Sequence, residues 1–250
     1  MLKPWDERRR LAVCDDLKSA ITYSVEHWLT CAKEAVQRHD AFFVALSGGS
    51  TPKAIFHALV QSPFKELIPW KKTHLFWSDE RSVPPNHPDS NYKMALDAGL
   101  REMPIPESQI HRMIAEEPIE ENALAYEAAI HRILGQHPFD LVMLGMGEDG
   151  HTASLFPHTQ ALHVHNRLVV ANHIPQKNTW RMTMTYPCLN SAHHIALYVL
   201  GDTKKEMVAK VLQGPERPDD YPIQRIGTAH HSALWILDKE AASLLTQANT

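Results

Sequence analysis

The sequence lacks several features that would mark a specialised class of protein. Its 250 residues include only three cysteines, which are widely spaced and form no Cys-x-x-Cys pair. A scattered, odd-numbered set does not suit a disulfide framework and fits a reduced compartment. The N-terminus has no apolar signal-peptide core, and no apolar run reaches the roughly 20 residues of a membrane span. These absences predict a cytoplasmic protein without a membrane partner.

A large excess of positive charge is also absent. The formal net charge is −4 and no long basic run occurs, which argues against nucleic acid as a partner. With 44% hydrophobic and 22% charged residues, the composition is that of a globular protein able to bury a substantial core. No stretch resembles an interdomain linker, so we expect residues 1–250 to form a single domain.

Short apolar runs alternate with amphipathic segments, a pattern typical of βαβ units. It predicts α/β architecture, with a mostly parallel, Rossmann-like sheet and helices on both faces. The expected strands are residues 41–46, 74–77, 140–144, 167–172, 194–200 and 233–237. The expected helices are residues 17–38, 52–61, 92–100, 119–134, 203–212 and 240–247.

Glycine is scarce, with 10 residues, but it is concentrated after two of the expected strands. The first cluster, Ser47-Gly48-Gly49, precedes Pro52, which suits the first turn of a helix. Such a helix start presents backbone N–H groups to a phosphate or an oxyanion, and nearby hydroxyls can cap its free amides. An ordinary strand–helix turn explains the same residues, and the Gly-Lys-Ser/Thr ending of a Walker A loop is missing.

The second cluster follows the expected strand 140–144 and contains Asp149 and His151. Ligands of open α/β sheets bind outside the carboxyl ends of the strands, so this loop should face the site. A carboxylate beside the one side chain that titrates near neutral pH indicates acid–base chemistry on a bound ligand. The alternative is that Asp149 caps a helix and that His151 is an ordinary surface histidine.

Charged residues follow other expected strands. Asp79 and Arg81 come after residues 74–77, where charges are costly to bury unless they are paired or occupied by a ligand. Arg181 and Lys204 are placed to reach the same edge of the sheet and hold a phosphate. A solvated turn, an edge-strand arginine and a surface lysine are the corresponding alternatives.

The histidine pairs His193-His194 and His230-His231 do not predict a metal site, because adjacent strand residues point to opposite faces. We recognise no metal-ligand spacing in the sequence. We therefore expect no required metal and no cofactor.

In this order, the motifs resemble those of the 6-phosphogluconolactonase family. The likeness spans roughly residues 15–237, and its most specific segment is 144–157. The resemblance implies hydrolysis of 6-phospho-D-glucono-1,5-lactone to 6-phosphogluconate in the oxidative pentose phosphate pathway. The other matching segments are residues 46–52, 77–84, 89–92, 181–185, 187–190 and 201–205.

The resemblance also implies a role for each candidate residue. His151 would be the general base that activates water, and its protonated form would return the proton to the ring oxygen. Asp149 would orient the imidazole or hold sugar hydroxyls. Arg81 and the amides of Gly48 and Gly49 are candidates for oxyanion and substrate binding. The further candidates are Ser47 and Asp79 for the substrate, and Arg181 and Lys204 for its phosphate.

Two other functions use a similar scaffold. Glucosamine-6-phosphate deaminases have related motifs, but they carry an aromatic residue at the position of Arg81 and a glutamate within the segment matching residues 152–157. A non-catalytic sugar-phosphate sensor would need a DNA-binding element, for which the α/β pattern leaves no room. The resemblance also raises a transient contact with glucose-6-phosphate dehydrogenase, which makes the lactone.

Overall fold

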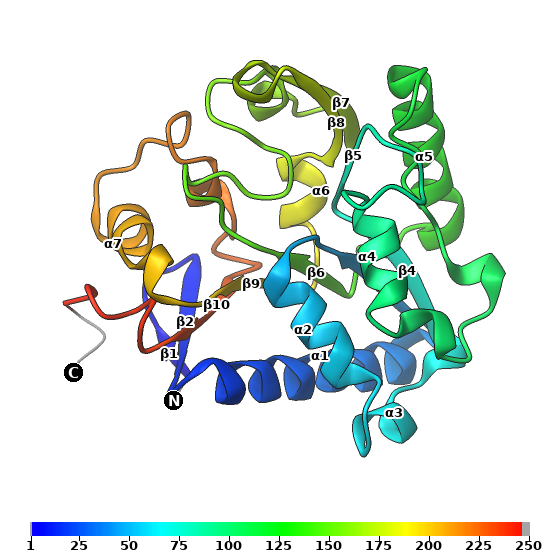
Figure 1. The fold of residues 1–250 in the computed structure, drawn as a ribbon, viewed down its shortest axis with the longest axis horizontal. Coiled ribbons are helices and arrows are strands. Elements are labelled where there is room, and N and C mark those ends of the chain that lie inside the picture. Colours follow the sequence, from blue (N-terminus) through cyan, green and yellow to red (C-terminus); the bar gives the residue numbers. More distant parts are fainter. Residues whose placement is uncertain (1, 247–250) are drawn as a thin grey trace.

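A seven-stranded sheet forms the centre of the computed structural model, which describes residues 2–246 (Figure 1). Every residue of three of its inner strands is buried, so both faces of the sheet are covered. The edge strand β1 is antiparallel to β2, and all other pairings are parallel, which confirms the predicted α/β fold class. In spatial order, the strands are β1 (Leu2–Pro4), β2 (Arg9–Cys14), β10 (Ala233–Asp238), β9 (His194–Val199), β6 (Leu141–Leu144), β3 (Phe42–Leu46) and β4 (Thr73–Trp77).

The longest helix, α1 (Leu17–His39), runs along one side of the sheet (Figure 1). It begins at Asp16, whose carboxylate accepts a hydrogen bond from the Ser19 amide at 2.7 Å, as acidic residues at a helix start should. Its buried face includes Trp28, whose ring lies edge-on to Phe42 of β3 at 4.8 Å. The other helices are α2 (Ser50–Leu59), α3 (Phe64–Leu67), α4 (Asn91–Asp97), α5 (Ile119–Leu134), α6 (Tyr186–Asn190) and α7 (Lys205–Gln213).

A second, antiparallel sheet has the order β5 (Asp79–Arg81), β8 (Thr179–Met184), β7 (Val169–Ile174). The expected strand 167–172 is therefore present as β7, but it belongs to this small sheet, not to the parallel one. Its partner β8 reverses the chain immediately after it, which makes the pair a hairpin.

The end of the chain differs from the expectation. The helix expected over residues 240–247 is not formed; residues 239–244 make successive turns, and Gln247 lies outside the described residues. The carboxylate of Asp238 accepts the amide of Ala241 at 2.8 Å, which favours a tight turn directly after β10. Within residues 2–246, no helix has the length and apolarity to cross a bilayer.

The order of the strands changes direction between β3 and β6. From β3 the chain passes through α2 to β4 on one side, whereas β6 lies on the other side and is followed outward by β9 and β10. The parallel register places Val44 opposite Leu141 and Ala45 opposite Val142, so both strands end at the same edge. A reversal of this kind opens a crevice beyond the carboxyl ends of the two strands, where α/β proteins bind ligands.

Candidate active site

A pocket of about 190 Å³ opens at this reversal, and we refer to it as the switch-point pocket. It is smaller than the roughly 300–1,000 Å³ typical of drug-sized ligand sites, so it suits a small polar molecule. The loops after β3 and β6 form two of its walls, and the second sheet forms another. Its lining residues are 47–49, 79, 81, 91, 145–147, 151–153 and 181.

The loop after β3 leads into the N-terminus of α2. Gly49 precedes the helix with φ 108°, a conformation that glycine adopts readily. Among residues 2–246 no side chain caps the helix, so the expected capping by nearby hydroxyls is wrong. The cause is that Gly49, which has no side chain, occupies the capping position. The first turn of α2 is thus open to an anion from the pocket.

Gly48 has no room for a side chain, because a Cβ atom there would lie 2.0 Å from Oδ1 of Asn91. Asn91 begins α4, and its amide donates to the backbone carbonyl of Asp79 at 2.9 Å. Asn91 belongs to the matching segment 89–92 but was not a candidate site residue, and it also lines the pocket. It joins the glycine loop to β5, a long-range contact without a local sequence signal.

Asp149 and His151 are paired as the sequence predicts for a common site. The His151 Nδ1 atom is hydrogen-bonded to the Asp149 carboxylate, and the same carboxylate accepts the His151 amide at 3.1 Å. Partial burial opposes ionisation, but these hydrogen bonds from His151 hold the pKa of Asp149 below its usual value. The ionised carboxylate of Asp149 accepts a hydrogen bond from Nδ1–H of the neutral imidazole, and in this tautomer Nε2 carries the lone pair.

The ring of His151 is held on two further sides. It is stacked on Phe156, with ring centroids 3.9 Å apart and an interplanar angle of 17°. A Cβ atom on Gly147 would lie 2.0 Å from His151 Nδ1, so the glycine lets the ring approach the loop. His151 lines the pocket, whereas Asp149 is not among the lining residues. The imidazole is therefore oriented before any ligand binds.

Two arginines lie side by side on neighbouring strands of the second sheet. Arg81 of β5 is directly opposite Arg181 of β8, and both line the pocket. Like charges at opposed positions are destabilising unless an anion offsets them. The Nε atom of each is buried without a hydrogen-bond partner in the part of the chain that the structure describes. Such donors are available to an anionic ligand.

The carboxylate of Asp79 lies beside these arginines and is 5% exposed. It accepts a hydrogen bond from the Ser154 hydroxyl at 2.6 Å. Burial lowers the pKa of Arg181, the neighbouring Asp79 raises it and Arg81 lowers it further. Arginine keeps its charge under such conditions, so a positive wall remains.

Glu80 has a role that the sequence did not indicate. It is 2% exposed, and its carboxylate accepts the amides of Asn91 at 2.8 Å and Tyr92 at 2.9 Å. These are N-terminal amides of α4, which would otherwise be buried without partners. Burial raises the pKa of Glu80 despite the hydrogen bonds. Glu80 thus fixes the helix that presents Asn91 to the pocket.

The remaining candidates, Ser47 and Lys204, differ in position. Ser47 is a buried lining residue at the end of β3. Lys204 is not a lining residue; its Nζ donates to the carbonyl of Met146 at 2.9 Å, directly behind the pocket wall. Met146 itself lines the pocket, so Lys204 contacts the pocket wall through this carbonyl.

Comparisons with known proteins identify the family of the chain. Residues 15–235 match the family model described as "Glucosamine-6-phosphate isomerases/6-phosphogluconolactonase". The chain is 38% identical to the 6-phosphogluconolactonase of Chlamydia trachomatis over 236 residues, which cover 94% of this chain and 90% of the relative. The corresponding protein of Chlamydia pneumoniae is 40% identical, with coverage of 88% and 84%.

Solved structures show the same fold. A 6-phosphogluconolactonase from Trypanosoma cruzi superposes with a TM-score of 0.83 at 29% identity, covering 94% of this chain and 96% of its own. A monomeric glucosamine-6-phosphate deaminase superposes with a TM-score of 0.79 over 94% of this chain and 99% of its own. At 21% identity, the deaminase supports the fold alone. By its sequence match and its architecture, this chain belongs to the glucosamine-6-phosphate isomerase/6-phosphogluconolactonase family.

Proposed function

We propose that this chain hydrolyses 6-phospho-D-glucono-1,5-lactone to 6-phosphogluconate in the oxidative pentose phosphate pathway. The observation that carries the proposal is the oriented His151–Asp149 pair at a pocket with two arginines. Relatives that share 38% and 40% of their residues with it are named 6-phosphogluconolactonase, which supports the same reaction here.

The proposed reaction begins with water held by Nε2 of His151. The imidazole takes a proton from the water as its oxygen bonds to the lactone carbonyl carbon. The carbonyl electrons move to the oxygen, and the resulting oxyanion is stabilised by Arg81 and the amides of Gly48 and Gly49. When the tetrahedral intermediate collapses, the bond to the ring oxygen breaks and the imidazolium returns its proton to that oxygen. Asp149 stabilises the imidazolium in between.

The substrate phosphate is assigned to the cationic side of the same pocket. Arg181 presents a buried, unpartnered Nε there, and the uncapped N-terminus of α2 presents amides. Lys204 adds a third positive group once it leaves the Met146 carbonyl. Asp79 and Ser47 are assigned to sugar hydroxyls, as an acceptor and as a donor or acceptor.

Deaminase activity is the second candidate, because the family includes glucosamine-6-phosphate isomerases. The segment 152–157, Thr-Ala-Ser-Leu-Phe-Pro, contains no carboxylate. Its Phe156 stacks on His151 where a proton relay would need an acid. This substitution favours lactone hydrolysis over ammonia release.

The direct test generates the lactone in situ and follows its loss against the spontaneous rate. The parent protein should accelerate hydrolysis, and His151→Ala should not. Arg81→Ala should lower kcat if Arg81 stabilises the oxyanion, whereas an effect on KM alone would reassign it to ground-state binding. Ammonia release from glucosamine 6-phosphate, without lactone hydrolysis, would overturn the proposal.

A cytoplasmic location is part of the proposal, and three free cysteines are consistent with it. A transient contact with glucose-6-phosphate dehydrogenase is proposed as well, because the lactone decays in water and a short transfer would limit that loss. Co-sedimentation of the two proteins during turnover would test the contact.

A further inference from the structure

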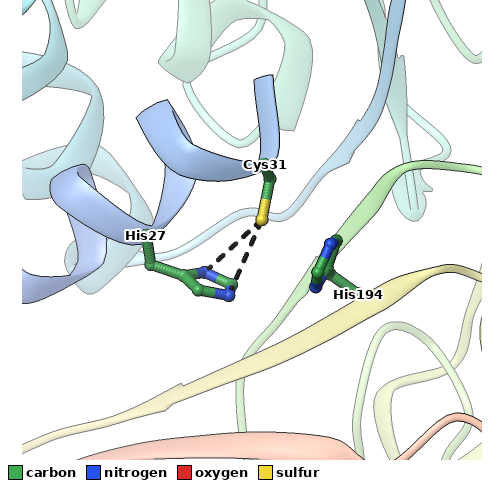
Figure 2. Close-up of side chains that lie close together, drawn as sticks. All are labelled: His27, Cys31 and His194. Carbon is green, nitrogen blue, oxygen red and sulfur yellow. Dashed lines mark hydrogen bonds between the residues drawn. The ribbon is translucent and has the colours of Figure 1, made fainter. Parts of the chain in front are cut away.

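Three potential metal ligands meet far from the switch-point pocket. His27 and Cys31 lie one turn apart on α1, and His194 begins β9 (Figure 2). We call these three residues the α1–β9 cluster. Their ligand atoms all lie within 4.8 Å of one another, and they form the one such group of three or more among residues 2–246. His27 and Cys31 are more than 160 residues from His194 along the chain, so the sequence alone does not indicate this group.

The spacing of the cluster suits a tetrahedral metal ion. Zinc binds cysteine sulfur at about 2.3 Å and histidine nitrogen at about 2.0–2.1 Å, so two such ligands lie roughly 3.6 Å apart. The His27 Nε2 and Cys31 Sγ atoms are 3.6 Å apart. Residues four apart on a helix share a face, as in helical zinc motifs. Small side-chain rotations would bring His194 to the same distance.

A carboxylate also holds His194 from outside the cluster. The Glu34 carboxylate, one further turn along α1, is 3.3 Å from Nε2 of His194. Metal-binding histidines commonly donate one ring N–H to a carboxylate while the other nitrogen binds the ion. With Nε2 held by Glu34, Nδ1 is the nitrogen of His194 that would bind the ion. Figure 2 shows the His194 ring beside Cys31 and His27.

The surroundings allow both entry and retention of an ion. Cys31 is 1% exposed, whereas the His194 side chain is 27% exposed and Glu34 is 50% exposed, so the cluster opens to solvent on one side. One thiolate, two imidazoles and a water molecule complete a four-coordinate set.

We propose that the α1–β9 cluster binds one zinc ion through His27, Cys31 and His194, with Glu34 orienting His194. His194 is opposite Leu141 in the β9–β6 register, at the amino end of both strands. The switch-point pocket lies beyond the carboxyl end of β6. The ion therefore ties α1 to the sheet and stabilises the fold, and it takes no part in lactone hydrolysis.

Cobalt substitution tests this site directly. Tag-free protein is treated with a chelator, dialysed and titrated with Co²⁺ alone. The expected result is one equivalent bound, with strong ligand-field bands of a tetrahedral ion and a thiolate-to-cobalt charge-transfer band. Zinc should displace the cobalt and raise Tm. These readouts do not depend on lactonase activity, so they remain informative if the proposed reaction is wrong.

Matched variants separate this site from the other histidines and cysteines. Cys31→Ser should abolish the charge-transfer band, and His194→Gln should weaken cobalt binding at least tenfold. Cys188→Ser, which changes another buried cysteine, and His193→Gln should retain both. If Cys31→Ser does not fold, the cobalt affinity of His194→Gln is sufficient to test the proposal. Absence of the band in the parent, or its persistence in His194→Gln with unchanged affinity, would overturn the proposal.

Discussion

The Asp149 carboxylate is hydrogen-bonded to Nδ1 of His151, and it also accepts the His151 backbone amide at 3.1 Å. The two hydrogen bonds hold the imidazole and the backbone of His151 to the same oxygen atom of Asp149. They direct Nε2 toward the pocket, where a water molecule can be deprotonated. The functional consequence is that rotation of the ring, and not only its removal, should abolish base catalysis.

Removal of the imidazole should lower kcat with little effect on KM. We expect His151→Ala to lose about 10²–10⁴-fold in kcat, the usual contribution of a general base. Initial rates with freshly generated lactone, corrected for spontaneous hydrolysis, measure the loss. His165→Ala, which changes an exposed histidine, is the matched control and should retain parent activity. An unchanged kcat in His151→Ala would refute the assignment.

Rotation of the ring can be tested at Gly147. Gly147→Ala places a methyl group about 2.0 Å from His151 Nδ1, so the ring must move away from Asp149. We expect a fall in kcat of about tenfold or more, because misplacement of a catalytic group by about 1 Å can cost 10²-fold. Glu148→Ala, which changes an exposed side chain of the same loop that does not line the pocket, is the control. Equal activity of the two variants would contradict the model of a pre-oriented ring.

Loss of a phosphate contact should raise KM. A hydrogen bond to a charged group contributes about 1.5–3 kcal/mol, so Arg181→Ala and Lys204→Ala should each raise KM about 10–100-fold. Lys205→Ala should not, because Lys205 instead pairs with Asp202 at 2.6 Å. Measuring kcat/KM for glucono-1,5-lactone without the phosphate isolates the effect. On that substrate, Arg181→Ala and Lys204→Ala should have the same kcat/KM as the parent protein. An equal fall in kcat/KM on both substrates would show that these residues do not bind the phosphate.

Removal of Glu80 should destabilise the protein. Glu80→Ala leaves the amides of Asn91 and Tyr92 without their acceptor, and we expect a cost of about 2–4 kcal/mol in the free energy of unfolding. Urea unfolding followed by tryptophan fluorescence measures it. Glu107→Ala, which removes an exposed carboxylate, should be near neutral. Equal free energies of unfolding for Glu80→Ala and the parent protein would show that water replaces the Glu80 carboxylate as the acceptor for these amides.

Stability should fall in mild acid. Burial, together with the neighbouring His74, lowers the pKa of His111 to about 4, below the ordinary value of about 6.5. Between those values, the unfolded chain binds a proton that the folded one does not, so stability decreases as the pH falls through the window. Because His111 is only partly buried, we expect this group to contribute on the order of 1–2 kcal/mol.

The His111→Asn variant tests that linkage. Urea midpoints at about pH 7 and about pH 5 should differ less in the variant than in the parent protein. Every other histidine is the same in both proteins, so the difference between the two pH-dependent changes in urea midpoint is due to His111 and its contact with His74. Equal changes in urea midpoint in the two proteins would mean that His111 and His74 do not contribute to the pH dependence of stability.

The inner strands could be predicted because their sequence is almost entirely apolar. Residues 41–46, 140–144 and 233–237 are nearly continuous hydrophobic runs, the signature of strands buried on both faces. The two strands at the other edge were missed. β2 begins with Arg9 and Arg10, and β1 is three exposed residues, so neither has that pattern.

The site divides in a similar way. Asp149 and His151 could be identified because they are two residues apart on one loop after a recognisable strand. Asn91 and Glu80 could not be assigned, because their contacts join segments about ten residues apart that form no periodic element. The His27–Cys31–His194 group depends on the packing of α1 against β9, which no spacing along the chain reveals.

The walls of the switch-point pocket come from four separate stretches, near residues 47–49, 79–91, 145–153 and 181. No single supersecondary unit contains enough of them to hold a substrate. A nascent or partly denatured chain with either sheet incomplete would therefore be catalytically silent. Enzymatic turnover thus reports the concentration of fully assembled molecules, and its loss in denaturant should coincide with global unfolding of the main sheet.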